Sequence, residues 1–351
     1  MKHLFSNSRI KFHTTSLFFV LFCCISLILC GCPATVEPVK EPLYSLPKGF
    51  PELIFPGDNP VNAEKIELGR KLFYDTLLSS DKSISCASCH RQELAFTDGK
   101  RVSRGVNGEL GNRNSPTIVN TGYAPHLFWD GRATSIEEQA LAAATNPAEM
   151  RAVESVIDVR LQQDSAYSVD FTRAFGNSTK PGLLLAMKAI ATFVRTVLSG
   201  SSRYDEFNNG NIAALNESEI RGKDLFFSKR TQCSECHSGF NFTDEEFHST
   251  GQFTHYFDQG RYDHTKKHSD VGKFKTPSLR NIALTAPYEH DGHVSTLEEV
   301  IEHYNVGGKD FINKDSRIRP LSLTDSEKKD LIAFLNSLTD NSLLNNKRFA
   351  K

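Results

Sequence analysis

The pentads Cys86-Ala-Ser-Cys89-His90 and Cys233-Ser-Glu-Cys236-His237 decide the fold of this chain. Each has the spacing of a c-type haem attachment site, in which two thiols bond covalently to the haem and the adjacent histidine ligates the iron. A lone Cys-x-x-Cys would also suit a redox disulfide or half of a zinc site. Here both pairs carry histidine at the same offset, and a four-cysteine zinc site would have to join pairs far apart in the chain. The sequence therefore predicts two covalently bound haem c groups.

The segments that precede the two pentads resemble each other. Gly69-Arg-Lys-Leu-Phe-Tyr74 comes before the first and Gly222-Lys-Asp-Leu-Phe-Phe227 before the second. This repeat indicates a duplicated unit, with a helix, a haem motif, and then loops and helices that fold over the haem. Ser199-Gly-Ser-Ser202 lies between the copies and indicates their boundary. We predict one haem domain over residues 61–200 and a second over residues 203–345.

Capping patterns predict helices in the second unit. Asn216, Thr296 and Thr324 are each followed three residues later by a glutamate, which is the pattern of a capping box. The last of these helices carries an apolar face over residues 331–338, and its counterpart in the first unit is residues 183–198. Strand signals are sparse. The predicted fold class is mostly α, with two tandem cytochrome c-like haem domains and long ordered loops.

The N-terminus has the pattern of an export signal. Basic residues, without a single acidic one, precede the apolar run 17–30, which is short for a membrane span of about 20 residues. Leu29-Cys30-Gly31-Cys32 resembles a bacterial lipobox, and ordinary signal cleavage nearby is the alternative. We predict a lipoprotein-type signal peptide over residues 1–31, a lipid on Cys32 as the sole membrane attachment, and a tether over residues 32–60. The expected location is the periplasm.

Charge and cysteine usage agree with this location. The chain has 41 basic and 42 acidic residues, so its charge gives no case for binding nucleic acid. Cys23, Cys24 and Cys30 leave with the signal peptide, Cys32 takes the lipid, and the other cysteines belong to the pentads. No cysteine remains for a disulfide, although an exported compartment would permit one.

Further motifs surround the two pentads in a specific order. They are Arg113-Asn-Ser-Pro-Thr117, Phe128-Trp-Asp-Gly-Arg132, Asn146-Pro-Ala-Glu-Met150, Thr276-Pro-Ser-Leu-Arg-Asn281, Leu284-Thr-Ala-Pro-Tyr288 and His290-Asp-Gly292. With these motifs the chain resembles the bacterial di-haem cytochrome c peroxidase/MauG family over the range 60–340. The resemblance implies an enzyme whose N-terminal haem is the peroxide site.

The resemblance implies roles for Glu149, Gln139 and Trp129. Glu149 and Gln139 would flank the open face of the first haem, where a carboxylate moves a proton between the peroxide oxygens and an amide orients peroxide or water. Trp129 would lie between the haems and pass electrons or holes. From the residues alone, Asn146-Pro147-x-Glu149 is also a good helix start with Glu149 as a cap, and a single tryptophan is also typical of a core.

An iron is reactive when one of its axial positions is open. Many family members block the peroxide site with a loop histidine, but residues 91–112 contain none, so we expect an open first haem. At the second haem the family resemblance places Tyr304 where activated peroxidases have methionine. His303 is a rival ligand, and an ordinary core tyrosine is the other alternative. A phenolate ligand stabilises oxidised iron, so Tyr304 predicts a low potential and a place to store an oxidising equivalent.

The resemblance also implies one calcium ion between the haems. The amide side chain of Asn114 and the backbone carbonyls of Thr285 and Pro287 would bind it, and such oxygen ligands suit Ca²⁺. His290 matches a family histidine near the haems. We expect His248, among the remaining histidines, to lie in a solvated loop.

Three functions are compatible with this pattern. The leading one is a periplasmic di-haem peroxidase that reduces hydrogen peroxide with electrons from a small redox protein, a cytochrome c or a cupredoxin. The second is a MauG-like enzyme that oxidises a partner protein through a high-valent two-haem state. The third is a non-enzymatic electron-transfer cytochrome, which would need two protein ligands on each iron. Tyr304 and the missing loop histidine favour MauG-like electronics without identifying the substrate.

Overall fold

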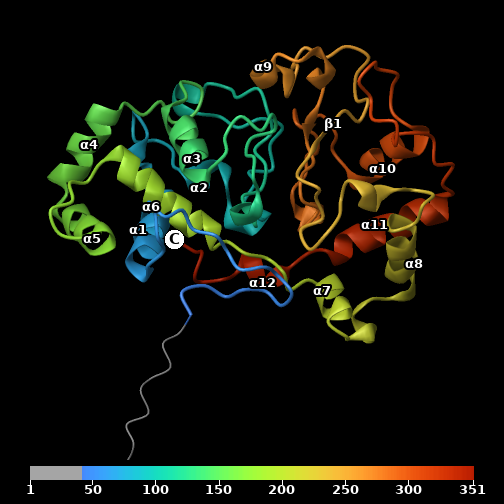
Figure 1. Cartoon of the computed structure of the whole chain (residues 1–351), viewed down its shortest axis with the longest axis horizontal. Helices are drawn as coiled ribbons and strands as arrows, with labels where there is room; N and C mark the ends of the chain where they lie inside the picture. The colour runs from blue at the N-terminus through green and yellow to red at the C-terminus, as the bar shows by residue number, and fades with distance from the viewer. Residues whose placement is uncertain (1–41) are drawn as a thin grey trace, which may run out of the picture. The chain divides into compact units, whose positions relative to one another are not determined.

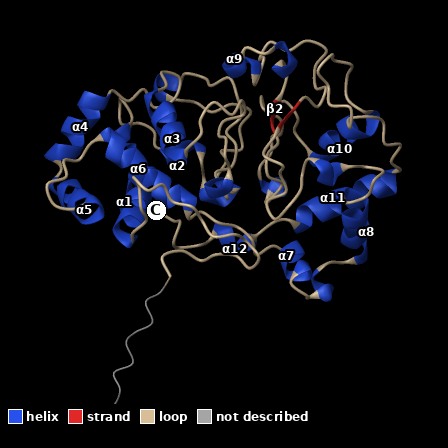
Figure 2. Cartoon of the chain, in the orientation of Figure 1, coloured by secondary structure: helices blue, strands red, loops and turns tan. Residues whose placement is uncertain are grey.

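The computed structural model of the chain describes residues 42–351. The predicted signal peptide 1–31 and the lipid site Cys32 lie outside the described residues. Helices joined by long loops dominate, and the one named sheet of the described chain is an antiparallel pair of two-residue strands (Figure 2). This confirms a mostly α fold.

The elements, in chain order, are α1 (Ala63–Phe73), α2 (Cys86–Cys89), α3 (Ile136–Thr145), α4 (Glu154–Gln163), α5 (Ser165–Phe175), α6 (Leu183–Arg195), α7 (Arg203–Asn208), α8 (Glu217–Phe226), β1 (Phe247–His248), α9 (Tyr262–Thr265), β2 (Phe274–Lys275), α10 (Leu297–Val306), α11 (Asp325–Ser337) and α12 (Asn341–Leu344).

Two separate hydrophobic cores organise the described residues. One is built mainly from residues 68–197 and the other from residues 226–338. In Figure 1 the helices α1 and α3–α6 gather on one side, and α8, α10 and α11 gather on the other. The two cores therefore follow the two copies of the sequence repeat.

Each core contains one close helix crossing at a glycine of the repeat. A Cβ atom on Gly69 of α1 would overlap the carbonyl oxygen of Ala189 in α6. A Cβ atom on Gly222 of α8 would overlap the carbonyl oxygen of Asp330 in α11 in the same way. Glycine lets the two backbones approach this closely. The predicted correspondence between α6 and the last long helix is confirmed, with α6 ending at Arg195.

The predicted helix starts are also confirmed. Asn216, Thr296 and Thr324 cap α8, α10 and α11, each in a complete capping box with the glutamate three residues later. The side-chain oxygen of each cap accepts a hydrogen bond from that glutamate's backbone N–H, which satisfies a donor that the helix leaves free.

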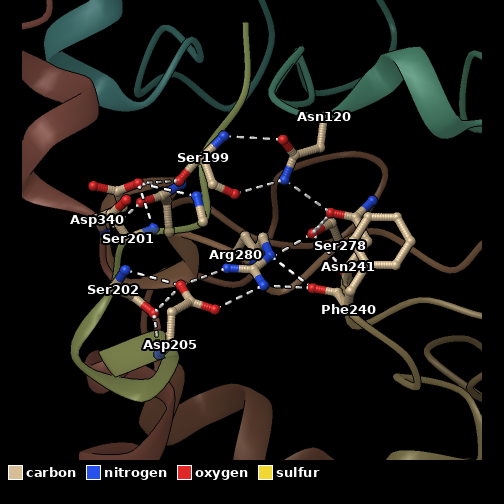
Figure 3. Close-up of polar contacts among 12 residues, drawn as sticks. Asn120, Ser199, Ser201, Ser202, Asp205, Phe240, Asn241, Ser278, Arg280 and Asp340 are labelled. Atoms are coloured by element: carbon tan, nitrogen blue, oxygen red, sulfur yellow. Dashed lines mark hydrogen bonds and ion pairs between the residues drawn. The ribbon is translucent and has the colours of Figure 1, made fainter. Parts of the chain in front are cut away.

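The predicted boundary at residues 199–202 is held by Asp340, and Ser199 and Ser202 are buried there (Figure 3). One carboxylate oxygen of Asp340 accepts hydrogen bonds from the Ser199 hydroxyl at 3.0 Å and from the backbone N–H groups of Gly200 at 3.1 Å and Ser201 at 3.0 Å. Ser199 N–H in turn donates to Asn120 Oδ1 at 3.0 Å. Hydrogen bonds to Asp340 and Asn120 therefore hold the connection between the two cores in place.

A buried ion pair lies beside this connection. Arg280 forms a two-pronged pair with Asp205 of α7, at 2.8 and 3.0 Å, and its Nε donates to the carbonyl oxygen of Phe240 at 2.8 Å. Such bidentate contacts fix orientation as well as distance. They hold the start of the second unit against the loop that follows its haem motif.

The C-terminal boundary at residue 345 is wrong, because the chain returns to the first core before that point. Leu343 and Phe349 are buried in the first core. The Gln92 side chain donates hydrogen bonds to the carbonyl oxygens of Leu343 at 2.8 Å and Asn346 at 2.9 Å. In Figure 1 the C-terminus lies beside α1 and α6.

The tether predicted over residues 32–60 is also too long. Phe50 and Leu53 are each 8% exposed, and Phe50 packs against Phe240 with ring centroids 4.6 Å apart. Asn59 is buried and donates to Glu137 at 2.7 Å. Phe50, Leu53 and Asn59 thus pack on the folded part. No helix of residues 42–351 is both long and apolar enough to cross a membrane.

Candidate haem sites

The two pentad histidines are held in the same way. His90 Nδ1 lies 3.0 Å from the carbonyl oxygen of Phe96, and His237 Nδ1 lies 3.1 Å from that of Phe242. This contact places the proton on Nδ1 and leaves Nε2 free to bind a metal. Burial lowers the pKa of both histidines, and the carbonyl contacts oppose that shift. A neutral imidazole with a fixed tautomer is what an iron ligand requires.

The four pentad cysteines make no disulfide in the described chain. Burial raises the pKa of Cys86 to about 12 and that of Cys236 to about 11, so these two thiols favour the protonated form. Cys233, Cys236 and His237 line a cavity of about 280 Å³. Mainly apolar and aromatic side chains complete its walls. The second pentad therefore opens onto a cavity that fits a covalently attached haem.

The two units face each other with matching contacts. Asn114 N–H donates to the carbonyl oxygen of His290 at 2.7 Å, and Lys275 N–H donates to that of Trp129 at 2.8 Å. Asn114 and Lys275 occupy equivalent places, each two residues before the proline of a Ser/Thr-Pro-Thr/Ser motif. The contacts are therefore related by an approximate twofold symmetry.

Trp129 lies at this junction. Its indole N–H donates to the Asn114 carbonyl oxygen at 2.9 Å, and its side chain lines the cavity of the second pentad. It belongs to neither hydrophobic core. The interpretation of Trp129 as a core aromatic therefore gains no support. The contacts place Trp129 where the two units meet.

The helices α3 and α10 begin at similar caps but differ at the position of Tyr304. Ser135 caps α3 and Thr296 caps α10 in the same manner. Eight residues after the cap, α10 carries Tyr304 whereas α3 carries Ala143. Tyr304 lines the same cavity as His237. An alanine offers no atom that can bind iron, so the equivalent position of the first unit is without a ligand.

His303 is directed elsewhere. Its Nε2 lies 2.9 Å from the Thr250 carbonyl oxygen, and the residue does not line the cavity of the second pentad. Burial raises the pKa of Tyr304 well above its ordinary value, so the phenol keeps its proton unless a metal displaces it. Between the two candidates, the geometry favours Tyr304.

Glu149 lies in a turn after α3, not at the start of a helix. Residues 147–150 are turn residues, and α4 begins only at Glu154. Glu149 accepts a hydrogen bond from the Asn146 side chain at 2.8 Å. Its carbonyl oxygen accepts from Val106 N–H at 2.9 Å, which fixes the turn. The capping interpretation of Glu149 is therefore wrong.

The charge of the Glu149 carboxyl acts on both thiols of the first pentad. Burial is the main cause of the raised pKa values of Cys86 and Cys89, and the charge of Glu149 adds to both. Burial also raises the pKa of Glu149 itself, while the Asn146 hydrogen bond and the Arg132 charge oppose that rise. A partly desolvated carboxyl beside the thiols can act as a proton carrier.

Gln139 and Arg132 are two further polar residues of the first unit. Gln139 is partly buried on α3, and its side chain makes no hydrogen bond to another residue of the described part. Its amide is thus available to a ligand. Arg132 stacks on the Phe128 ring at 3.4 Å and contacts Asp130 at 2.9 Å.

The predicted calcium ligands all line the cavity of the second pentad. They are Asn114, Thr285 and Pro287. Asn114 Nδ2 donates to the Lys100 carbonyl oxygen at 2.9 Å, so its Oδ1 is turned the other way. Among residues 42–351, no hydrogen bond reaches this Oδ1 or the carbonyl oxygens of Thr285 and Pro287. Amide and carbonyl oxygens without donors are the ligand type that suits Ca²⁺.

The expectation for His248 is wrong. It lies in β1, and its two ring nitrogens contact carboxylates of Asp315 and Asp244, each at 2.9 Å. Cys236, Asp244 and His248 lie close enough together to share a metal ion. Since Cys236 belongs to a haem pentad, we interpret His248 and its carboxylate partners as a polar part of the wall around the second site.

Comparison with known proteins agrees with this geometry. The profile of the family described as di-haem cytochrome c peroxidase matches residues 63–213. The cytochrome-c peroxidase IdrP1 of Denitromonas iodatirespirans is 38% identical over 322 residues, which cover 83% of this chain and 85% of that protein. The chain belongs to the di-haem cytochrome c peroxidase/MauG family.

Other relatives come from both branches of the family. The methylamine utilization protein MauG of Methylorubrum extorquens is 35% identical, over 87% of each chain. The crystal structure of a MauG-like protein associated with microbial copper homeostasis is 40% identical, with a TM-score of 0.84, and covers 88% of this chain and 98% of that one. Membership in this family makes the chain an oxidoreductase of the cytochrome c peroxidase type with two c-type haems.

Sequence reasoning missed the partners of the pentad histidines. Phe96-Thr97-Asp98 follows the first pentad and Phe242-Thr243-Asp244 follows the second. This short repeat marks the two carbonyl oxygens that hold the histidines. Aligning the sequences after the caps Ser135 and Thr296 would also have shown that Ala143 stands where the second unit has Tyr304.

Proposed function

We propose that this chain is an exported di-haem peroxidase that reduces hydrogen peroxide, with an open first haem on His90 and a second haem held between His237 and Tyr304. The observation that carries the proposal is the difference between equivalent helices, with Ala143 in the first unit and Tyr304 in the second. The two hydrophobic cores support two tandem haem domains, approximately 61–200 and 203–340. Electrons would come from a small cytochrome c or cupredoxin.

The first haem would supply a Lewis-acidic iron and a store of oxidising equivalents. The chain's own residues would handle the protons. Glu149 lies near Cys86 and Cys89, and its hydrogen bond with Asn146 sets its direction. The carboxyl would take a proton from one peroxide oxygen and return it to the other. The free amide of Gln139 would orient the peroxide.

Trp129 would carry charge between the two haems. It lies at the contact between the units, and hydrogen bonds at both its indole N–H and its carbonyl oxygen hold it there. A Ca²⁺ ion on Asn114, Thr285 and Pro287 would stiffen the same junction. The ion would draw together a loop of the first unit and a loop of the second.

A MauG-like reaction on a partner protein is the second candidate, and Tyr304 favours it. A phenolate ligand stabilises oxidised iron, so the second haem would accept electrons poorly and hold an oxidising equivalent well. The substrate would then be a residue of another protein. Lipid attachment through Cys32 would keep either enzyme at the periplasmic face of a membrane.

Electron paramagnetic resonance of a Tyr304→Phe variant tests the proposal. We expect the low-spin signal of the second haem to disappear, with two haems per chain retained. Tyr288→Phe is the matched control, because Tyr288 lines the same cavity and its hydroxyl donates to the Ile282 carbonyl oxygen at 3.1 Å. A low-spin signal that survives in Tyr304→Phe would contradict the assignment. A first haem that is also low-spin would favour a pure electron-transfer cytochrome.

A further inference from the structure

An arginine of the second unit binds the backbone of the first unit directly after Trp129. Arg261 Nη1 donates hydrogen bonds to the carbonyl oxygens of Asp130 at 2.9 Å and Gly131 at 3.1 Å. The central carbon of its guanidinium lies 3.8 Å from the centroid of the Phe247 ring. A planar guanidinium that stacks on a ring and donates to two acceptors is fixed in orientation as well as in distance. Arg261 therefore holds one segment of the first unit in a defined place.

Gly131 lets the two units approach closely at this contact. A Cβ atom on Gly131 would lie 2.2 Å from the Phe247 ring and 2.5 Å from Arg261 Nη1. The φ angle of Gly131 is +67°, which also favours glycine. The backbone of the first unit thus lies directly against the second unit, two residues from Trp129.

Asp130, the residue after Trp129, is buried and bound at both of its polar groups. Its carboxylate accepts a hydrogen bond from Arg113 Nη1 at 2.6 Å and pairs with Arg132 at 2.9 Å. Arg113 in turn donates two hydrogen bonds to Asp258 of the second unit, at 2.7 and 2.8 Å. The carboxylate of Asp130 is therefore linked to the second unit through Arg113, and its carbonyl oxygen is linked directly through Arg261.

The other side of the junction has a longer version of the same contact. His290-Asp291-Gly292 is equivalent to Trp129-Asp130-Gly131, and Arg101 Nε of the first unit donates to the Asp291 carbonyl oxygen at 3.2 Å. Arg101 is exposed, whereas Arg261 is partly buried and makes two shorter hydrogen bonds. Each unit thus binds the other through one arginine, and the shorter contacts lie on the tryptophan side.

We propose that Arg261 is a positioning residue that fixes Trp129 between the two haems and so sets the rate at which charge passes through it. The inference rests on the proposed function, which gives Trp129 that role. Lys275 N–H donates to the Trp129 carbonyl oxygen at 2.8 Å, so the carbonyl oxygens of three consecutive residues, 129–131, all accept hydrogen bonds from the second unit. The Trp129 backbone cannot shift without breaking these contacts. Arg261 acts through Trp129 and does not touch the peroxide.

The test uses the di-haem protein and follows Trp129 directly, because it is the only tryptophan in the chain. Ultraviolet resonance Raman bands of tryptophan report the hydrogen bond of the indole N–H, and stopped-flow absorbance after mixing with peroxide reports how fast the second haem is oxidised. Arg261→Met keeps an apolar stem against Phe247 but removes the donor, and Arg261→Lys restores a donor.

We expect Arg261→Met to shift the indole band and to slow oxidation of the second haem by about tenfold or more, since a misplacement of about 1 Å can cost about 10²-fold in rate. The reaction of the first haem with peroxide should be unchanged. Arg261→Lys should recover most of both signals. If the methionine variant loses haem, Arg261→Gln, with a shorter polar side chain, takes its place with the same expected result.

Arg101→Met is the matched control, because it removes the equivalent arginine on the other side of the junction. We expect its indole band and its haem kinetics to equal those of the parent. Parental values in Arg261→Met, or an equal change in Arg101→Met, would overturn the proposal.

Trp129→Phe distinguishes this inference from the proposed function. If Trp129→Phe slows oxidation of the second haem and Arg261→Met does not, the positioning role alone is overturned. If Trp129→Phe keeps the parental rate, the charge-carrying role of Trp129 is wrong, and the positioning role is overturned with it.

Discussion

Replacing Glu149 by glutamine separates its catalytic role from a structural one. The change keeps the side-chain shape and leaves an oxygen that can accept the Asn146 hydrogen bond of 2.8 Å. It removes the group that accepts a proton. General acid–base catalysis by one side chain contributes about 10²–10⁴-fold, or ~2.7–5.4 kcal/mol of barrier. We therefore expect peroxide reactivity to fall by at least ~10²-fold.

The effect on stability should be small. Replacing a charged acceptor by a neutral one weakens the Asn146 hydrogen bond by about 1 kcal/mol. In the opposite direction, burial raises the pKa of Glu149, so the folded chain favours the protonated form and the ionised carboxylate costs stability at neutral pH. Glutamine removes that cost. The two effects largely cancel, and we expect a change in unfolding free energy within about 1 kcal/mol.

Stopped-flow mixing with peroxide and thermal unfolding of the same samples measure both quantities. Glu154→Gln is the matched control, because Glu154 is an exposed carboxylate five residues away in the first turn of α4. It should leave peroxide reactivity unchanged. A Glu149→Gln variant with parental kinetics would refute the catalytic assignment, and one that unfolds at a much lower temperature would refute the stability reasoning.

Three other changes test separate parts of the account. Replacing Cys86 and Cys89 by alanine should leave one covalent haem per chain in the pyridine haemochrome assay, and a protein with two haems or with zinc would contradict the pentad assignment. Arg132→Gln removes a charge that lowers the pKa of Glu149, so the acid limb of the peroxide pH–rate profile should move to higher pH; an unmoved limb would mean that another group controls it. A calcium chelator should lower the melting temperature of the parent but not that of Asn114→Leu, and equal responses would contradict the calcium site.

The parts of the fold that depend on local chemistry were predictable from the sequence. The haem pentads specify their ligands within five residues, capping boxes specify helix starts, and Gly69 and Gly222 mark the two close helix crossings. The prediction of Tyr304 as a ligand came only from family resemblance, since its spacing fits a core helix equally well. The caps of α3 and α10 now align the two helices and put Ala143 in the place that matches Tyr304.

Predictions failed where long-range packing decides the outcome. The chain end returns to the first core through Leu343 and Phe349, and no local pattern indicates which core a short apolar segment joins. Phe50 and Leu53 pack although residues 33–60 lack apolar periodicity. Asn146-Pro147-x-Glu149 has the residues of a helix start, but hydrogen bonds to the neighbouring loop hold it as a turn.

The most direct test of the central claim is rapid mixing of the fully oxidised protein with hydrogen peroxide, without any reductant. Ala143 stands where the second unit has Tyr304, and residues 91–112 contain no histidine, so the first haem should be open from the start. The account predicts a high-spin signal before mixing and an immediate change of the haem spectrum afterwards. A reaction that begins only after the second haem has been reduced would contradict it.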